Sequence, residues 1–171
     1  RQTVARLKKG RRVEELEQFA LNDSMTGMYN RNAYDYFVKN EKDFEGYVIV
    51  TFDLNNLKQC NDQYGHRAGD EYIINAAHII EDNFERYGKC YRIGGDEFCC
   101  IIPKGRYFKI ERVMHKIDQN VEILNHKNII PVPVGIAYGY AVFTADDTDP
   151  EKVRERADED MYRNKKAMKQ S

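Results

Sequence analysis

The sequence lacks any long hydrophobic run and has no clear excess of positive or negative charge. No apolar stretch approaches the roughly 20 residues that a membrane-spanning helix needs, and no signal peptide is visible. We therefore expect a cytoplasmic domain that makes no direct contact with a membrane. The net charge of −1 argues against a general nucleic-acid-binding protein, because such binding draws on an excess of Lys and Arg. A small phosphorylated ligand held by a few local cations is compatible with this charge.

Cysteine is also scarce, with 4 residues that form no Cys-x-x-Cys pair: Cys60, Cys90, Cys99 and Cys100. This pattern favours reduced cysteines that act as small hydrophobic side chains over a disulfide framework. The chain is 42% hydrophobic and 32% charged, which is typical of a folded globular protein. Its 171 residues fit one domain of ordinary size.

The first 21 residues have a helical pattern of apolar side chains among many charges, although Gly10 interrupts it and the heptad is imperfect. The chain starts with Arg1 rather than Met, and we expect it to be a piece of a longer protein. We interpret residues 1–21 as a connecting helix from an upstream sensory or linker domain. Residues 22–171 would then form the functional domain. Whether the parent protein is attached to a membrane is left open.

The remaining sequence interleaves helices and strands. A turn is predicted over residues 22–27. Helices are predicted over 31–39 (with Asn30 as N-cap), 69–86, 110–124 and 150–167, and strands over 47–53, 90–93, 98–102 and 132–142. The two central strands indicate a hairpin around Gly94 and Gly95, where a turn uses glycine for positive φ. In the last strand, alternating small residues indicate a face that another element covers closely. The order predicts an α+β fold, with helices packed on a mixed or antiparallel sheet.

Acidic residues follow one strand and occupy the tip of the predicted hairpin. Asp53 ends an apolar strand, and Asp96 and Glu97 lie in the hairpin turn. Taken separately, each has an ordinary explanation as turn chemistry or as a solvated charge. If the strand lies beside the hairpin, the carboxylates converge at one end of the sheet. Carboxylate oxygens suit Mg²⁺, which shares its coordination with substrate phosphates. The constellation therefore points to nucleotidyl transfer.

The segment after Asp53 offers groups for a nucleotide. A short helix there would turn backbone N–H groups near Leu57 and Lys58 toward the same site, although a polar connecting loop explains the composition equally well. Farther on, an amide and a carboxylate could read a purine, since a carboxylate accepts from N1–H and N2–H of guanine. Asp70 could instead be the first-turn acid of the following helix. The polar groups concerned are Asn61, Asp62, His66 and Asp70.

The run Arg92-Ile93-Gly94-Gly95-Asp96-Glu97-Phe98 contains the signature that names the GGDEF family. The chain resembles this family over roughly residues 22–167. Further similar blocks occur in the family's order: Asp23-x-x-Thr26-Gly27-x-x-Asn30-Arg31, the segment from Phe52 to Asp70, and Ala157-Asp158-x-x-Met161-Tyr162-x-x-Lys165.

The resemblance implies a five-stranded, mainly antiparallel sheet flanked by helices, similar to the palm of nucleotide cyclases and polymerases. It also implies a diguanylate cyclase that condenses two GTP into cyclic di-GMP and two pyrophosphates. The cofactor would be Mg²⁺ or Mn²⁺. Because each family domain binds one GTP, a homodimer would be required. No nucleic-acid partner is implied.

The same resemblance assigns roles to individual residues. Asp53 and Asp96 would bind metal through their side chains and Leu54 through its carbonyl. Asp96 or Glu97 would help to activate the 3′-hydroxyl. The remaining residues would contact the substrate: Asn61 and Asp70 the guanine, Lys58, Lys165 and the N–H groups around Leu57 the triphosphate, with His66 in the same substrate segment.

The chain departs from the family pattern at several positions. Asn55 replaces an acid commonly found two residues after the metal aspartate. Glu85 and Gly88 occupy the places of the RxxD inhibition motif, so no feedback inhibition is expected through that site. The chain reads Met168-Lys169-Gln170 where the family usually has Gly-Arg-Asn, and Lys169 could serve as a phosphate cation without the bidentate fork of Arg. Asp160 and Asn164 stand where the family often has alanine, which predicts looser docking of the last helix.

Two alternatives stay open beside an active cyclase. One is a catalytically silent GGDEF domain that acts as a GTP-binding sensor or interaction module, for which the altered C-terminal segment is the support. The other is a cyclase that also accepts adenine nucleotides. Asp70 argues against it, because a carboxylate would face the acceptor N1 of adenine.

Overall fold

The fold comes from a computed structural model that describes residues 2–105 and 109–170, without the side chains of residues 2, 3, 18 and 168–170. Its strands are β1 (Val48–Leu54), β2 (Lys89–Arg92), β3 (Glu97–Ile102) and β4 (Ile136–Val142). Its helices are α1 (Gln2–Leu21), α2 (Arg31–Asn40), α3 (Leu57–Tyr64), α4 (His66–Phe84), α5 (Ile110–His126) and α6 (Pro150–Gln170). The predicted α+β class is confirmed, and the expected short helix after Asp53 is α3.

The sheet has four strands in the order β2-β3-β1-β4, and every pairing is antiparallel. The expectation of five strands is therefore wrong for the described part of the chain. Beyond β2, the described residues form an isolated bridge between Tyr29 and Tyr91. The last strand also starts at Ile136 rather than at residue 132. Before it, the side chain of Asn125 bonds to both N (2.8 Å) and O (3.0 Å) of Val134, taking the place of a neighbouring strand.

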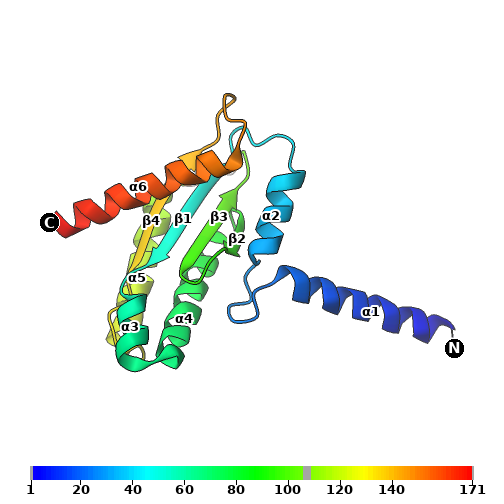
Figure 1. The fold of residues 1–171 in the computed structure, drawn as a ribbon, viewed down its shortest axis with the longest axis horizontal. Coiled ribbons are helices and arrows are strands. Elements are labelled where there is room, and N and C mark those ends of the chain that lie inside the picture. Colours follow the sequence, from blue (N-terminus) through cyan, green and yellow to red (C-terminus); the bar gives the residue numbers. More distant parts are fainter. Residues whose placement is uncertain (1, 106–108, 171) are drawn as a thin grey trace.

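Two hydrophobic clusters cover the two faces of the sheet. On one face, Val50 and Phe52 of β1 pack with α3, α4 and α5. On the other face, Ile49 packs with residues of α2 and α6. Figure 1 shows α6 crossing β4 and β1, with α4 and α5 behind the sheet. The alternation of strand side chains explains this division and turns Asp53 toward the side of α6. All four cysteines are free and buried, as expected for small hydrophobic side chains.

Helix α1 projects away from the sheet (Figure 1), and it continues through Gly10. Asn30 joins it to the rest of the domain. The Asn30 side chain caps α2 by accepting from Ala33 N (3.0 Å), as predicted, and it also donates to Ala20 O at the end of α1 (2.9 Å). Several large apolar side chains of α1 are exposed, including Leu7 and Phe19. Among the described residues, no helix combines the length and apolar character needed to span a bilayer.

Candidate active site

Asp53 and Asp96 meet at the end of β1, beside the β2–β3 hairpin. In the register of β1 and β3, Asp53 lies opposite Glu97. The carboxyl group of Asp96 is within hydrogen-bond reach of Asp53, and burial together with the charge of Asp53 raises the pKa of Asp96. The convergence of carboxylates expected from the sequence is therefore present. Two partly buried acids this close repel each other unless a proton or a cation lies between them.

A positively charged side chain lies at Asp53. The Lys165 ammonium group, from α6, forms an ion pair with Asp53 Oδ2. The two side chains are only 29% and 23% exposed, so solvent screens the pair less than it would at an open surface. Lys165 thus contacts a carboxylate, and its contact with a triphosphate stays a prediction.

A hollow of about 300 Å³ opens beside this ion pair, between the hairpin and α6. Asp53, Glu97, Tyr162 and Lys165 contribute to its wall. Glu97 is exposed, and its side chain folds over Gly94: a Cβ on Gly94 would lie 3.2 Å from Glu97 Oε2. The glycine is thus explained by close approach. The expected positive φ at the hairpin glycines is wrong, because neither glycine adopts it.

Arg92 and Asp23 hold the hairpin in place, a role that the sequence did not reveal. Arg92 Nη1 contacts both carboxylate oxygens of Asp23 (3.2 and 3.1 Å), and Arg92 Nη2 donates to Gly95 O (2.9 Å). Burial alone would raise the pKa of Asp23, but hydrogen bonds from Thr26 and the charge of Arg92 lower it. The hairpin tip is thereby tied to the predicted turn over residues 22–27. Asp23 and Arg92 each lie in a block that resembles a family motif, and this was the signal in the sequence that could have pointed to their role.

The turn from β1 into α3 is fixed by the buried Tyr72 of α4. The Tyr72 hydroxyl accepts from Gly135 N (2.9 Å) and donates to Asn55 O (2.6 Å), and burial raises the pKa of Tyr72 to about 12. Leu54 and Leu57, on the two sides of this turn, have buried side chains. The turn is therefore rigidly placed next to Asp53. The sequence analysis did not single out Tyr72.

The first turn of α3 keeps its N–H groups open to a ligand. Its N-cap, Asn56, adopts a left-handed conformation (φ 62°) and makes no side-chain cap. The first N–H groups of a helix without such a cap are available to an anion. Lys58 is exposed in this turn. Both features agree with the expected anionic ligand near Leu57 and Lys58.

The two residues expected to read guanine are close neighbours. Asn61 of α3 lies against Gly69 of α4: a Cβ on Gly69 would be only 1.7 Å from Asn61 Oδ1. Asp70 is the next residue along the chain, and both Asn61 and Asp70 are partly exposed. His66 is the first residue of α4 and is exposed. Gly69 is thus the reason that the Asn61 amide can lie against the backbone of α4, next to Asp70 in the sequence.

The fit of this site to a divalent cation follows from its two carboxylates. Within residues 2–105 and 109–170, no group of three or more His, Cys, Asp or Glu side chains forms a complete metal cage. Mg²⁺ is usually held by one or two carboxylates together with waters and substrate phosphates. The proximity of Asp53 and Asp96 meets this requirement. The residues present therefore fit Mg²⁺ or Mn²⁺ bound jointly with a nucleotide.

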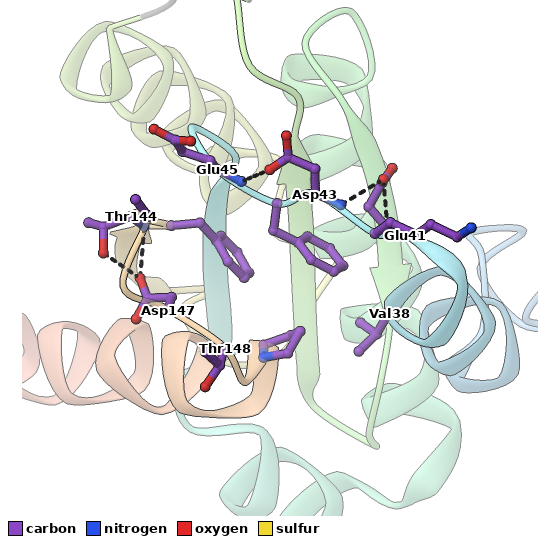
Figure 2. A pocket seen from close by; sticks show the side chains of 12 residues that line it. Val38, Glu41, Asp43, Glu45, Thr144, Asp147 and Thr148 are labelled. Atoms are coloured by element: carbon purple, nitrogen blue, oxygen red, sulfur yellow. Dashed lines mark hydrogen bonds between the residues drawn. The ribbon is translucent and has the colours of Figure 1, made fainter.

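A larger hollow, of about 480 Å³, lies at the opposite end of β1 and has several acidic side chains on its wall. Figure 2 shows that the carboxylates of Glu41, Asp43 and Asp147 accept hydrogen bonds from backbone N–H groups of nearby turns. Glu41 accepts from the N–H groups of Lys42 and Asp43, and Asp147 accepts from Thr144. Because these carboxylates stabilise loops, the hollow has no feature that competes with the site at Asp53.

The fold and site define an α+β domain in which one end of the sheet gathers two carboxylates, a lysine and an open helix start. Comparison with known proteins gives the family: residues 20–171 match the family model described as "Diguanylate cyclase, GGDEF domain". The chain therefore belongs to the GGDEF family. Its four-stranded antiparallel sheet flanked by helices matches solved GGDEF domains.

Individual relatives agree with this assignment. The chain is 32% identical over 132 residues to the bifunctional diguanylate cyclase/cyclic di-GMP phosphodiesterase MucR of Pseudomonas aeruginosa, covering 72% of this chain and 19% of MucR. It is 28% identical over 158 residues to the diguanylate cyclase DgcS of Shewanella oneidensis, covering 89% of this chain and 52% of DgcS. The chain thus spans at most about half the length of these two relatives.

The solved coiled coil and GGDEF domain of DgcB from Caulobacter crescentus, in complex with c-di-GMP, has the same fold. The TM-score is 0.77 at 23% identity, and the match covers 97% of this chain and 92% of that chain. A match this extensive includes most of α1. At this level of identity the similarity concerns the fold alone.

Proposed function

We propose that this domain is a diguanylate cyclase that condenses two GTP molecules into cyclic di-GMP and two pyrophosphates. The observation that carries the proposal is the meeting of Asp53 and Asp96 beside an open helix start. Membership of the GGDEF family supports it, as do relatives named diguanylate cyclases. Because its substrate would be GTP, we propose that the domain works in the cytoplasm, under the control of an upstream region.

The chemistry joins the 3′-hydroxyl of each GTP to the α-phosphate of the other, so that two ester bonds form and one pyrophosphate leaves at each. A bound Mg²⁺ or Mn²⁺ would neutralise phosphate charge and lower the pKa of the attacking hydroxyl. Asp53 and Asp96 would hold this cation through their side chains and Leu54 through its carbonyl, while Asp96 or Glu97 would accept the proton of the hydroxyl. The pyrophosphate leaves with the negative charge that develops on it.

The triphosphate is held by charge and by backbone N–H groups. The N–H groups around Leu57 and the Lys58 ammonium bind it from α3, and Lys165 binds it from α6. Their support is the uncapped start of α3 and the position of the Lys165 ammonium at the metal carboxylates. Preorganised donors of this kind stabilise charge that develops during reaction.

Guanine is recognised by the Asn61 amide and the Asp70 carboxylate, with His66 at the rim. The support is that the Asn61 amide lies against Gly69, the residue before Asp70. A carboxylate accepts from N1–H and N2–H of guanine, and adenine offers neither donor. This arrangement favours GTP over ATP.

Two domains must face each other, because each supplies one GTP. Helix α1 offers a means to hold two copies together, since it projects from the domain with exposed apolar side chains. Burying such side chains against a second α1 would remove them from water. The homodimer is thus part of the proposal.

The test is product formation by a dimerised domain. The domain is fused to a dimerising coiled coil and incubated with GTP and Mg²⁺, and cyclic di-GMP and pyrophosphate are measured by chromatography. We expect product from the natural sequence and none from Asp96→Ala. Asp82→Ala serves as control, since Asp82 is exposed on α4 and has no assigned role. Bound GTP without any product would favour a silent sensor domain instead.

A further inference from the structure

Helix α6 lies directly on β4, in backbone contact. A Cβ on Gly139 of β4 would be 2.1 Å from Met161 N and 2.2 Å from Ala157 O, so no side chain fits between strand and helix at this point. This contact confirms the expectation that a face of small residues in β4 is closely covered. It fixes the distance of α6 from the sheet, but it leaves open the position of the helix along the strand.

Three side chains of α6, spaced four residues apart, set that position by bonding to the open edge of β4. Arg156 Nη2 donates to Val142 O, and Asn164 Nδ2 donates to Tyr138 O. Between them, Tyr140 N donates to Asp160 Oδ2. Each of these three hydrogen bonds is 3.0 Å long. Four helical residues rise about 6 Å, and two strand residues rise about 6.7 Å. The four-residue repeat of the helix therefore matches the two-residue repeat of the strand over the length of β4. Helix and strand run antiparallel.

The three hydrogen bonds between α6 and β4 form a ladder, and this ladder contradicts the expected loose docking of the last helix. Asp160 and Asn164 do not weaken the contact, because both pair with backbone groups that an edge strand otherwise leaves unpaired. The ladder also fixes α6 against sliding, since a shift by one residue would break its bonds. These bonds hold the C-terminal part of the helix in one register on β4.

Lys165 extends the row of α6 side chains that faces the sheet. The row repeats every four residues, from the buried Val153 and Ala157 through the partly buried Met161 to Lys165. Asn164, the last member of the ladder, directly precedes Lys165. The register that Asn164 and Asp160 impose therefore delivers the Lys165 ammonium to Asp53. A positive charge already lies at the carboxylate that would bind a divalent cation.

We propose that Asp160 and Asn164 are positioning residues that hold Lys165 on Asp53, and that Lys165 competes there with the divalent cation while no nucleotide is bound. This inference rests on the proposed function, because the cation is the one that the cyclase requires. The triphosphate of a bound nucleotide offers Lys165 a second anionic partner, so that Lys165 releases Asp53. The domain is thereby kept from holding metal before its substrate arrives.

The competition has a measurable consequence for metal affinity. When only a fraction of the domain has Asp53 free, the apparent Kd for the metal rises by the inverse of that fraction. Removing the ammonium group removes the competitor. The nucleotide-free domain should then bind metal more tightly, although it loses a group proposed to bind substrate. A residue that served structure alone would not produce this effect.

The experiment measures Mn²⁺ binding to the nucleotide-free domain by electron paramagnetic resonance of free Mn²⁺. We expect Lys165→Met to bind Mn²⁺ about tenfold more tightly than the natural sequence. Lys166→Met is the matched control, because Lys166 is exposed and stands over the Tyr162 ring instead. It removes the same charge one residue away, and its effect should stay within about twofold. Equal effects of the two variants, or no gain with Lys165→Met, would overturn the inference.

The positioning role is tested by Asn164→Ala, which changes no charge. It should tighten Mn²⁺ binding several-fold by loosening the hold on Lys165. Asn75→Ala is its control, since the Asn75 side chain bonds only within its own helix, to Glu71 O (2.8 Å). Thermal unfolding verifies that each variant is folded. An unchanged Mn²⁺ affinity in folded Asn164→Ala would remove the positioning role.

Asp53→Ala separates this inference from the proposed function. If it abolishes Mn²⁺ binding while Lys165→Met has no effect, the metal site stands and only the competition is wrong. If Asp53→Ala leaves Mn²⁺ binding unchanged, the proposed metal site fails and the inference fails with it.

Discussion

Lys165 and Asp53 form an ion pair between residues that are 112 positions apart in the sequence. The pair joins the C-terminal helix to the end of the central strand, at the place where Asp96 also approaches. One cation and two carboxylates thus share a small, partly buried space. This relationship links the fold to the proposed chemistry, because the same groups decide both how α6 is held and what the site can bind.

Replacing Asp96 by asparagine should separate stability from activity. Burial and the charge of Asp53 raise the pKa of Asp96, so at neutral pH its ionised form destabilises the fold. Asp96→Asn removes this repulsion, and we expect the melting temperature to rise by about 2–4 °C, as for a gain of about 1 kcal/mol. Cyclase activity should be lost. A variant that is less stable and still active would contradict both roles of Asp96.

The effect of Asp96 on stability also has a defined pH dependence. Because its folded pKa is raised, the destabilisation is absent in acid and develops as the pH rises through the unfolded value of 3.8 toward the folded value. Urea unfolding at a series of pH values should show the stability gap between Asp96→Asn and the natural sequence widening over this range. A gap that is constant with pH would exclude the ionisation of Asp96 as its cause.

Gly69→Ala should weaken GTP binding without unfolding the domain. The added methyl group would overlap with Asn61 Oδ1 and push the amide out of its place against α4. Loss of one hydrogen-bonding group corresponds to about 1–3 kcal/mol, or roughly tenfold or more in KM for GTP. Alanine favours a helix over glycine by about 1 kcal/mol, so stability should be kept. Gly10→Ala, where the methyl group meets nothing within 4 Å, is the matched control. An unaltered KM would disprove the role of Asn61.

Tyr72→Phe should destabilise the domain, because it leaves the partly buried N–H of Gly135 and the carbonyl of Asn55 without their hydroxyl partner. The expected loss is about 1–3 kcal/mol in the free energy of unfolding, measured by urea denaturation. Tyr64→Phe, at an exposed position, should change it by less than about 0.5 kcal/mol. Equal stability of the two variants would mean that the hydroxyl does not hold this turn.

Asp23→Asn should destabilise the hairpin in a pH-dependent way. The pKa of Asp23 is lowered in the folded state, so its ionised form stabilises the fold above the unfolded value of 3.8, and this contribution is lost as the pH falls through the folded value. The variant should therefore be less stable at pH 7, by about 1–3 kcal/mol, and the difference should shrink in acid. Unfolding curves at several pH values test this. A difference that grows in acid would reverse the sign and refute the pairing with Arg92.

Local patterns in the sequence were sufficient for most of the fold. Three features depend only on neighbours along the chain and agree with the structure. They are the apolar run of β1, the apolar stripe of α4 at helical spacing, and the Asn30 cap. The strand predicted from residue 132 was too long, because its pattern does not reveal that Asn125 bonds to Val134 in place of a strand. The local patterns predicted four strands, as the described residues have, and the fifth strand was implied by the family resemblance alone.

The site shows the same division between local and long-range information. The proximity of Asp53 and Asp96 followed from a strand next to a hairpin, but the ion pair with Lys165 depends on the register of a helix more than 100 residues away. Asp160 and Asn164 were misjudged because a polar residue in a docking face indicates loose packing unless its backbone partner is known. The side chain of Lys169 lies outside the described residues, so its phosphate contact stays a prediction.

The most direct test of the account is the position of the metal. A crystal of the domain, grown with Mn²⁺ and a GTP analogue that cannot release pyrophosphate, would give the site from anomalous scattering. The account predicts a Mn²⁺ peak within bonding distance of both Asp53 and Asp96, with Lys165 turned from Asp53 toward the phosphates. Bound nucleotide with Mn²⁺ at other residues, and Lys165 still paired with Asp53, would contradict it.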